Sequence, residues 1–420
     1  MLKAHRPFQP VILGGDIGAY ALARELNDSF GCTSILVTAY YPRAIQESRI
    51  LTRRYFKRAN EAEPLAHELI RIAQGIRRKQ PTLPLLLLAN TDWRIDALSR
   101  FRPQLEDYYI VPIPQRRTID QVINKQNFAR IAHSVGMRVP TTFYQDFSHA
   151  DDSAWQPKPL PNDMSFPVVA KPADSSTYEQ LSFPGRQKVY RIENQDQLDR
   201  LWQALRRAGF RSTFLAQQLI PGDDTCMYSV TAYVDRRGTV TMMSAAHVLL
   251  QEHHPAMLGN PCAMITEPLP ELTEPAQRFL QRVDYHGFAN FDVKRDARDG
   301  TFYFLEINPR IGRNSYYCVG AGINPMDVLV DDVIDEKQRP EGRADRLSLY
   351  TLVPRFLLRR YVQPDTWRTI SSLYRSGNVV NPLHNPRDAS LKRRRRIMAI
   401  ELGLVKKFRT YYPQQTETGF

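Results

Sequence analysis

The stretch that most constrains this chain is a two-stranded ribbon spanning Phe288–Arg313. Its two halves are rich in aromatic and β-branched residues and are separated by Asp299-Gly300, a hairpin turn signal. Folding the ribbon about Asp299 places Asp292 opposite or close to Glu306. Asn308 lies two residues beyond Glu306, so the two side chains project from the same face of the strand. The ribbon therefore predicts two carboxylates and an amide oxygen converging on one spot.

Such a cluster of acids requires a positive partner. Like charges facing each other across a strand pair are destabilising. Mg²⁺ takes oxygen ligands and shares its remaining positions with phosphate oxygens, so it is the natural occupant. Arg310, just past the strand, is placed to reach the same phosphates. The alternative is a surface hairpin whose acids are solvated.

Further cationic and polar candidates lie upstream of the ribbon. Phe166–Lys171 is a short buried strand that ends in a lysine, which is costly unless the charge meets an anion. Ser175 and Ser176 follow in a small polar run that could wrap phosphates. Lys125 lies in the predicted amphipathic helix Thr118–Val135, where a solvated lysine is the default interpretation.

Residues 1–117 predict an α/β domain with a parallel sheet. Strand-like runs at Pro10–Leu13, Ser34–Thr38 and Leu85–Ala89 alternate with helical patterns. The Gly-Gly-Asp-Ile-Gly run after the first strand is not a dinucleotide-binding fingerprint and predicts a tight strand-to-helix turn. Within it, Asp16 is a candidate for contacting a substrate amine.

We expect two further domains. Residues 118–335 hold the lysines and the ribbon, and the charged stretch Asp335–Asp345 has the composition of a linker. Residues 336–420 predict a basic, mainly helical region. Its last helix, Ser390–Phe408, contains the run Lys392–Arg396, for which a solvated helix face is the default and a partner site the alternative.

Composition limits the partners and the compartment. The net charge of +13 fits nucleic acid, anionic lipid or a polyphosphorylated substrate. No zinc-finger, RNP-type or KH-type pattern is present, so we expect no dedicated nucleic-acid binding, and peripheral membrane contact through the basic C-terminus is an alternative. The four scattered cysteines, the short apolar runs and the lack of a signal-peptide pattern predict a cytoplasmic protein without a transmembrane segment.

Taken in order, these residues resemble the ATP-grasp ligase superfamily. The matching pieces are Lys125 in a helix, Lys171 at a strand end, QQLIPGDD at Gln217–Asp224 and FDVKRD…FLEINPR at Phe291–Arg310. Their order and combination carry the resemblance, because each piece alone is weak. The resemblance implies an ATP-grasp fold over residues 118–335.

The resemblance also implies ATP as cosubstrate, Mg²⁺ as metal with Mn²⁺ as the alternative, and a role for each matching residue. The implied nucleotide-binding residues are Lys125, Lys171, Ser175, Ser176, Gln217, Gln218, Ile220 and Asp224. The implied metal ligands are Asp292, Glu306 and Asn308, and the implied catalytic residues are Arg310 and Arg313. Serines replace the glycines that many members carry after the second lysine, and Gln218 replaces an acid or lysine in the hinge.

Within the superfamily the chain is similar to D-aspartate ligases of peptidoglycan cross-bridge synthesis. The similarity rests on VILGGDIGAYALAREL, QQLIPGDD and the basic C-terminal helix with KKFRTYYP. It implies an amide-forming ligase that works through an acyl phosphate and adds D-aspartate to the lysine side chain of a UDP-MurNAc-pentapeptide. The adjacent His253 and His254 are expected in a substrate lid or at the surface. The alternatives are a ligase of small amino acids or dipeptides and a non-catalytic nucleotide-binding protein with a basic tail.

Overall fold

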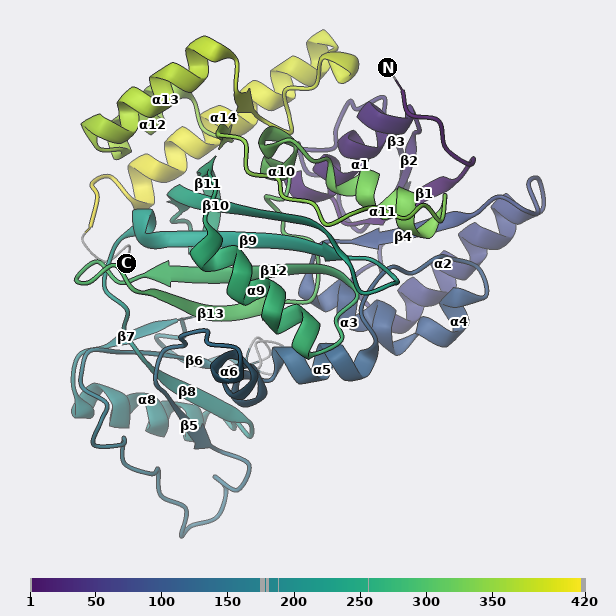
Figure 1. Ribbon diagram of the computed structural model, residues 1–420. Coiled ribbons are helices and arrows are strands. Elements are labelled where there is room, and N and C mark those ends of the chain that lie inside the picture. Colours follow the sequence, from purple (N-terminus) through teal and green to yellow (C-terminus); the bar gives the residue numbers. More distant parts are fainter. Residues whose placement is uncertain (1, 174–177, 179–180, 188, 256, 417–420) are drawn as a thin grey trace.

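The computed structural model contains three β-sheets, and helices pack on their faces (Figure 1). It describes residues 2–173, 178, 181–187, 189–255 and 257–416. Strands alternate with helices in the first part of the chain and helices dominate its end, so the predicted mixed α/β class is confirmed.

The N-terminal sheet is parallel throughout, as predicted, with the order β3-β2-β1-β4. Its strands are β1 (Gln9–Leu13), β2 (Ser34–Thr38), β3 (Leu51–Tyr55) and β4 (Leu85–Ala89). Its helices are α1 (Ile17–Phe30), α2 (Ala62–Arg77), α3 (Asp92–Arg100) and α4 (Arg102–Glu106). The sequence did not predict β3, whose last four residues are exposed, because an edge strand lacks the apolar signal of a buried one.

Residues 118–135 do not form the single helix that their periodicity predicts. The chain forms α5 (Arg116–Ile123) and α6 (Lys125–Ser134), separated by Asn124 in an extended conformation. The Asn124 side chain accepts a hydrogen bond from the backbone N–H of Asn127 at 3.0 Å and so caps α6. The prediction was wrong because an amphipathic stripe continues across the break. Lys125 consequently begins a helix instead of lying inside one.

A small antiparallel sheet with the order β5-β8-β6-β7 follows. Its strands are β5 (Thr142–Asp146), β6 (Val168–Pro172), β7 (Tyr190–Ile192) and β8 (Thr213–Gln218), and α8 (Gln195–Arg207) connects β7 to β8. Edge-to-face contacts join Trp202 of α8 to Phe147 and Phe214, so an aromatic core holds the helix against this sheet.

The largest sheet has the order β13-β12-β9-β10-β11-β14-β15. Its strands are β9 (Met227–Val234), β10 (Val240–Glu252), β11 (Asn260–Thr266), β12 (Gly287–Arg295), β13 (Phe302–Asn308), β14 (Ser348–Thr351) and β15 (Val379–Val380). The accompanying helices are α9 (Pro270–Arg282), α10 (Tyr317–Ala321) and α11 (Pro325–Val333). Because β14 and β15 lie beyond residue 335, the sheet runs into the C-terminal region, and the division into three domains stays a prediction.

The chain ends in three helices, which lie together at the top of Figure 1. They are α12 (Arg355–Tyr361), α13 (Pro364–Ser376) and α14 (Leu391–Tyr411). α14 buries Ile397, Leu404 and Phe408 along one face. In the part of the chain that the structure describes, no helix combines the length and apolar character needed to span a bilayer.

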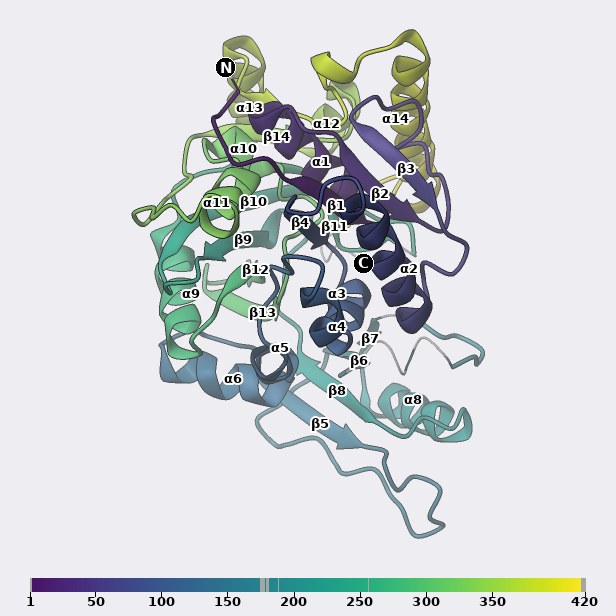
Figure 2. The ribbon, with the colours of Figure 1, turned by 90° about the vertical axis from the view of Figure 1, so that its right-hand side faces the viewer.

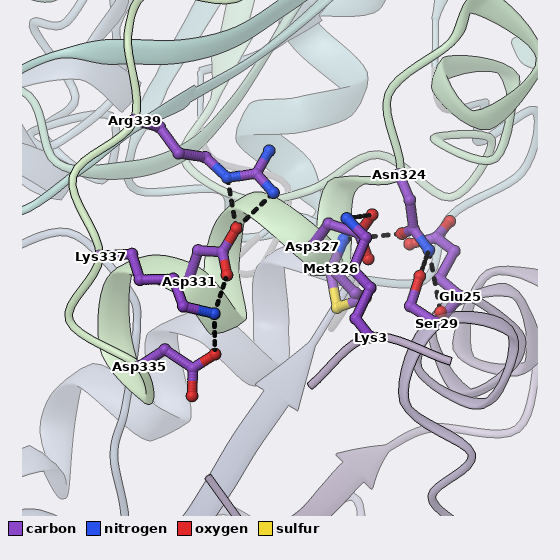
Figure 3. A network of polar contacts seen from close by, with 10 residues as sticks. All are labelled: Lys3, Glu25, Ser29, Asn324, Met326, Asp327, Asp331, Asp335, Lys337 and Arg339. Atoms are coloured by element: carbon purple, nitrogen blue, oxygen red, sulfur yellow. Dashed lines mark hydrogen bonds and ion pairs between the residues drawn. The ribbon is translucent and has the colours of Figure 1, made fainter. Parts of the chain in front are cut away.

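A polar network joins α11 to α1 and to the N-terminal segment (Figure 3). The Asn324 side chain donates to the backbone carbonyl of Glu25 and to the Ser29 hydroxyl, each at 2.9 Å. Lys3 pairs with Asp327. Burial, with Asp327 nearby, raises the pKa of the fully buried Glu25 carboxyl well above its usual value. The N-terminal sheet is thus fastened to the large sheet through α1 and α11.

Candidate active site

The ribbon pairs as predicted. β12 and β13 are antiparallel, with Asp292 opposite Glu306 and Asn290 opposite Asn308. Gly300 closes the turn with a φ of 77°, which favours glycine. The expected convergence of Asp292, Glu306 and Asn308 on one face is therefore confirmed, while their role as metal ligands stays a prediction.

Asp292 is held by amides and perturbed by a neighbouring acid. Asn308 Nδ2 donates to Asp292 Oδ2 at 3.0 Å, and Asn290 Nδ2 donates to the other oxygen at 3.2 Å. Burial and the charge of Glu306 raise the pKa of Asp292 to about 6, whereas Arg310 opposes that rise. A divalent cation would relieve this repulsion, and carboxylate and amide oxygens are the donors it prefers. These residues fit magnesium once the Asn308 amide is turned, because its nitrogen faces Asp292 and its oxygen faces Arg310 in this structure.

Two lysines from separate elements meet Glu306. Lys125 Nζ, at the start of α6, lies 2.5 Å from Glu306 Oε2, and Lys171 Nζ, on β6, lies 3.9 Å from the same oxygen. Their side chains are only 17% and 19% exposed, so both charges are drawn out of solvent at one carboxylate. The structure thus brings together lysines that are 46 positions apart in the sequence.

Arg310 lies beside the ribbon but is bound by α3. Its Nε and Nη2 are 2.7 and 3.0 Å from the two carboxylate oxygens of Asp92, a bidentate pair. Arg310 Nη2 also lies 3.3 Å from Asn308 Oδ1. The arginine predicted to contact phosphates is therefore held at the end of β13 by the N-terminal part of the chain.

The predicted hinge residues lie at the end of β8. Gln217 is buried, and its amide donates to the Thr142 hydroxyl at 2.9 Å. Gln218 accepts from the Thr141 backbone N–H at 3.4 Å, and Ile220 is buried just beyond the strand. Ser175 and Ser176, the predicted phosphate-covering serines, lie outside the described residues.

Asp224, the predicted ribose ligand, is buried against the C-terminal region. Its Oδ2 accepts from the Gln251 backbone N–H at 2.8 Å and lies 2.9 Å from His253 Nε2. The His253 ring stacks on Tyr412 with centroids 3.5 Å apart, and its side chain is only 5% exposed. The prediction of a surface position is therefore wrong for His253, which is a packed residue that links Asp224 to the end of α14. The alternative of a substrate lid stays a prediction.

A second polar cluster forms where the N-terminal sheet faces the ribbon. Arg313 Nε lies 3.2 Å from Asp16 Oδ2, and Asp16 also caps α1 by accepting from the Ala19 backbone N–H at 2.9 Å. Asn90 Nδ2 lies 3.4 Å from Asp16 Oδ1. Arg94 donates to the Thr91 hydroxyl at 2.9 Å, and burial lowers its pKa. The cluster thus contains two cations, Arg94 and Arg313, and one anion, Asp16. These charges are complementary to the two carboxylates and one ammonium group of an acidic amino acid.

Sequence reasoning missed Asn90 and Arg94. Asn90 Oδ1 is buried and has no hydrogen-bond partner in the described part of the chain, so a buried acceptor faces this cluster unsatisfied. A signal was present, because Asn90 follows directly after the buried strand β4 and Arg94 lies in the first turn of the next helix, α3. The carboxyl ends of parallel strands are where α/β sheets bind ligands.

Comparison with known proteins finds similarity to an ATP-binding domain and to a ligase. Residues 124–321 match the family described as "Carbamoyl-phosphate synthase L chain, ATP binding domain". The chain is 27% identical to the D-aspartate ligase of Enterococcus faecium (strain Aus0004), over 96% of this chain and 97% of that protein.

Solved structures share the fold at low identity. The biotin carboxylase domain of the Hydrogenobacter thermophilus 2-oxoglutarate carboxylase, solved with MgADP and bicarbonate, has a TM-score of 0.57 at 14% identity, covering 82% of this chain and 73% of that one. The N5-carboxyaminoimidazole synthetase of Staphylococcus aureus has a TM-score of 0.54 at 14% identity, covering 81% of each chain. Together, the domain match and the full-length relative indicate an ATP-dependent, amide-forming ligase that carries an ATP-grasp ATP-binding domain over residues 124–321.

Proposed function

We propose that this ligase activates D-aspartate with ATP and joins it to the lysine side chain of a UDP-MurNAc-pentapeptide. The observation that carries the ATP site is the meeting of Lys125 and Lys171 at Glu306, opposite Asp292. The choice of acid and acceptor is supported by the similarity to a D-aspartate ligase over nearly the whole chain.

The ribbon is the proposed metal and phosphate end of the site. Asp292, Glu306 and Asn308 would hold Mg²⁺, with Mn²⁺ as the alternative; once bound, the metal supplies positive charge that stabilises the phosphate oxygens. Lys125 and Lys171 would exchange Glu306 for those oxygens, because phosphates offer both cations a more highly charged partner. The two lysines would thus hold positive charge in place before the reaction, and such electrostatic positioning is the main requirement of phosphoryl transfer.

The adenosine end is assigned to the hinge. We place the adenine at Gln217, Gln218 and Ile220 and the ribose hydroxyls at Asp224. Two lone pairs of the Asp224 carboxylate are already used by Gln251 and His253, so the remaining oxygen would have to accept from the ribose.

The cluster around Asp16 is the proposed site of the acid. Arg313 would bind the free carboxylate of the amino acid, and Asp16 would bind its ammonium group. The substrate would thus replace the ion pair that Arg313 and Asp16 form with each other. Arg94, buried nearby, would keep the region positive when a dicarboxylate enters. The remaining carboxylate of the acid would then face Arg310 and the ribbon.

The reaction proceeds in two displacements. A carboxylate oxygen attacks the γ-phosphorus, the bond to the β–γ bridging oxygen breaks, and ADP leaves with that electron pair. The lysine amine of the acceptor then attacks the acyl carbon, phosphate leaves, and a proton is lost from the nitrogen. Arg310, Lys125 and Lys171 would stabilise the charge on the transferred group.

Phosphate release measured with Mg·ATP tests the assignment. We expect release to require both D-aspartate and the UDP-muramyl pentapeptide, with L-aspartate and D-glutamate as matched controls. Release with amino acids alone would favour the ligase of small amino acids or dipeptides. No release across a broad substrate screen would favour the non-catalytic nucleotide-binding protein. Hydroxylamine trapping would identify the activated carboxylate. The cytoplasmic location and the lack of dedicated nucleic-acid binding stay predictions.

A further inference from the structure

The outward face of α14 is not accounted for by the ligase chemistry. This helix carries eight basic residues and one acidic residue, and Figure 2 shows it at the upper right of the molecule. Basic residues on its inward side contact other parts of the protein, whereas those on its outward side are exposed to solvent.

The inward cations contact groups of the protein itself. Arg393 has no exposed side-chain surface; it donates to the Gln46 carbonyl at 2.8 Å and lies 4.3 Å over the Tyr20 ring, with Asp388 at 3.7 Å. Lys407 pairs with the buried Glu252. These contacts fasten the helix at both ends, so its position does not depend on the outward charges.

The outward cations have no such partners. Six basic residues are exposed and make no ion pair or side-chain hydrogen bond with any residue that the structure describes: Lys392, Arg394, Arg395, Arg396, Lys406 and Arg409. Several of them lie in the first turns of the helix, where cations oppose the dipole. Clustering unpaired like charges there costs stability unless an anion offsets it.

An apolar stripe runs between these cations. Leu391, Met398 and Leu402 are 77%, 53% and 61% exposed. Their spacing of seven and four residues aligns them on one side of the helix, along about 17 Å at 1.5 Å per residue. An apolar stripe flanked by cations is the pattern of a helix that lies in the plane of a membrane interface.

A hollow lies at the beginning of the stripe. Its volume is about 560 Å³, and its lining includes Leu391 and Lys392 of α14 together with Arg49 and Arg53 from the N-terminal sheet region. Glu47 is the one carboxylate in this lining. The side chains of Arg49 and Arg53 are exposed and form no ion pair within the described residues. Three cations therefore surround a space that would admit an anionic headgroup.

We propose that the outward face of α14, with this hollow, docks on the surface of an anionic lipid bilayer, the helix lying parallel to the membrane plane. The cations would contact lipid phosphates, and the stripe would enter the boundary between headgroups and acyl chains. Nucleic acid fits less well, since the exposed apolar stripe would add nothing to contacts with a phosphate backbone. The proposal does not depend on which acid or amine the enzyme ligates.

Co-sedimentation of the full chain with vesicles tests the docking surface. We expect binding to vesicles that contain phosphatidylglycerol, little binding to pure phosphatidylcholine, and weaker binding at high salt. One surface cation contributes about a fivefold gain in lipid affinity, so the triple variant R394Q/R395Q/R396Q should bind about 100-fold more weakly. The variant L391S/M398S/L402S should also lose binding although its charge is unchanged.

A matched control removes the same charge elsewhere. Arg200, Arg207 and Arg282 are exposed on α8 and α9 and unpaired within the described residues, so R200Q/R207Q/R282Q should change lipid affinity by no more than about threefold. The control variant and L391S/M398S/L402S should keep the wild-type melting temperature, and R394Q/R395Q/R396Q should melt at or above it because clustered like charges are removed. All variants should keep lipid-free phosphate release. The proposal is overturned by equal losses in the two charge variants, by no binding to anionic vesicles, or by an R394Q/R395Q/R396Q defect confined to nucleic acid or to the KM of the acceptor.

Discussion

Gly18 offers a direct test of how the N-terminal sheet is joined to the ribbon. It is the second residue of α1, and a Cβ added there would lie 2.1 Å from Asn90 Nδ2. It would also lie 2.9 Å from the carbonyl oxygen and 3.0 Å from the Cα of Arg313. The Asn90 side chain can turn away, but the Arg313 contacts are backbone and can lengthen only if that loop moves. Gly18→Ala should therefore displace the loop that carries Arg313.

The expected magnitude follows from two opposing effects. Alanine favours the helix over glycine by up to about 1 kcal/mol. Overpacking costs about 1–3 kcal/mol, and the clash with backbone leaves little room for relief. We expect a net loss on the order of 1–2 kcal/mol in the free energy of unfolding. Because a misplacement of about 1 Å can cost about 100-fold in rate, kcat/KM for the acid should fall by about 10- to 100-fold.

Urea unfolding and phosphate release at varied acid concentration measure both effects. The matched control is Gly75→Ala, in α2, where an added Cβ meets no heavy atom within 4 Å. That variant should gain about 0.5–1 kcal/mol in stability and keep wild-type kinetics. If Gly18→Ala behaves like Gly75→Ala in both assays, the close approach of α1 to the Arg313 loop is not a constraint and the reasoning fails.

Three further outcomes are expected. Glu306→Gln should abolish ligation by at least about 100-fold with an unchanged circular dichroism spectrum, and near-normal turnover would remove Glu306 from the metal assignment. Lys171→Ala should weaken ATP affinity by about 10-fold or more in a calorimetric titration, whereas unchanged affinity would make it a strand-end lysine only. Glu25→Gln should stabilise the protein more at pH 8 than at pH 5. The folded protein retains the Glu25 proton above the ordinary carboxyl pKa and the unfolded chain does not, so wild-type stability falls as pH rises through that window. Equal stabilisation at both pH values would show that Glu25 does not titrate abnormally.

Local pattern was sufficient for the features that depend on near neighbours. The pairing of Asp292 with Glu306 follows from a turn signal and a two-residue period, and the structure has that register. The parallel N-terminal sheet likewise follows from alternating strand and helix patterns. The break at Asn124 was missed, since a side-chain cap can interrupt a helix without disturbing its apolar stripe.

The remaining features were decided by contacts between distant parts of the chain. No spacing rule brings Asp92 to Arg310, His253 to Asp224 or Arg94 into the cluster around Asp16. By itself, the sequence determined which residues carry charge and which short segments pair. Only the tertiary structure decided which charges neutralise one another and which stay available, because burial and partner distance arise from packing separate elements together.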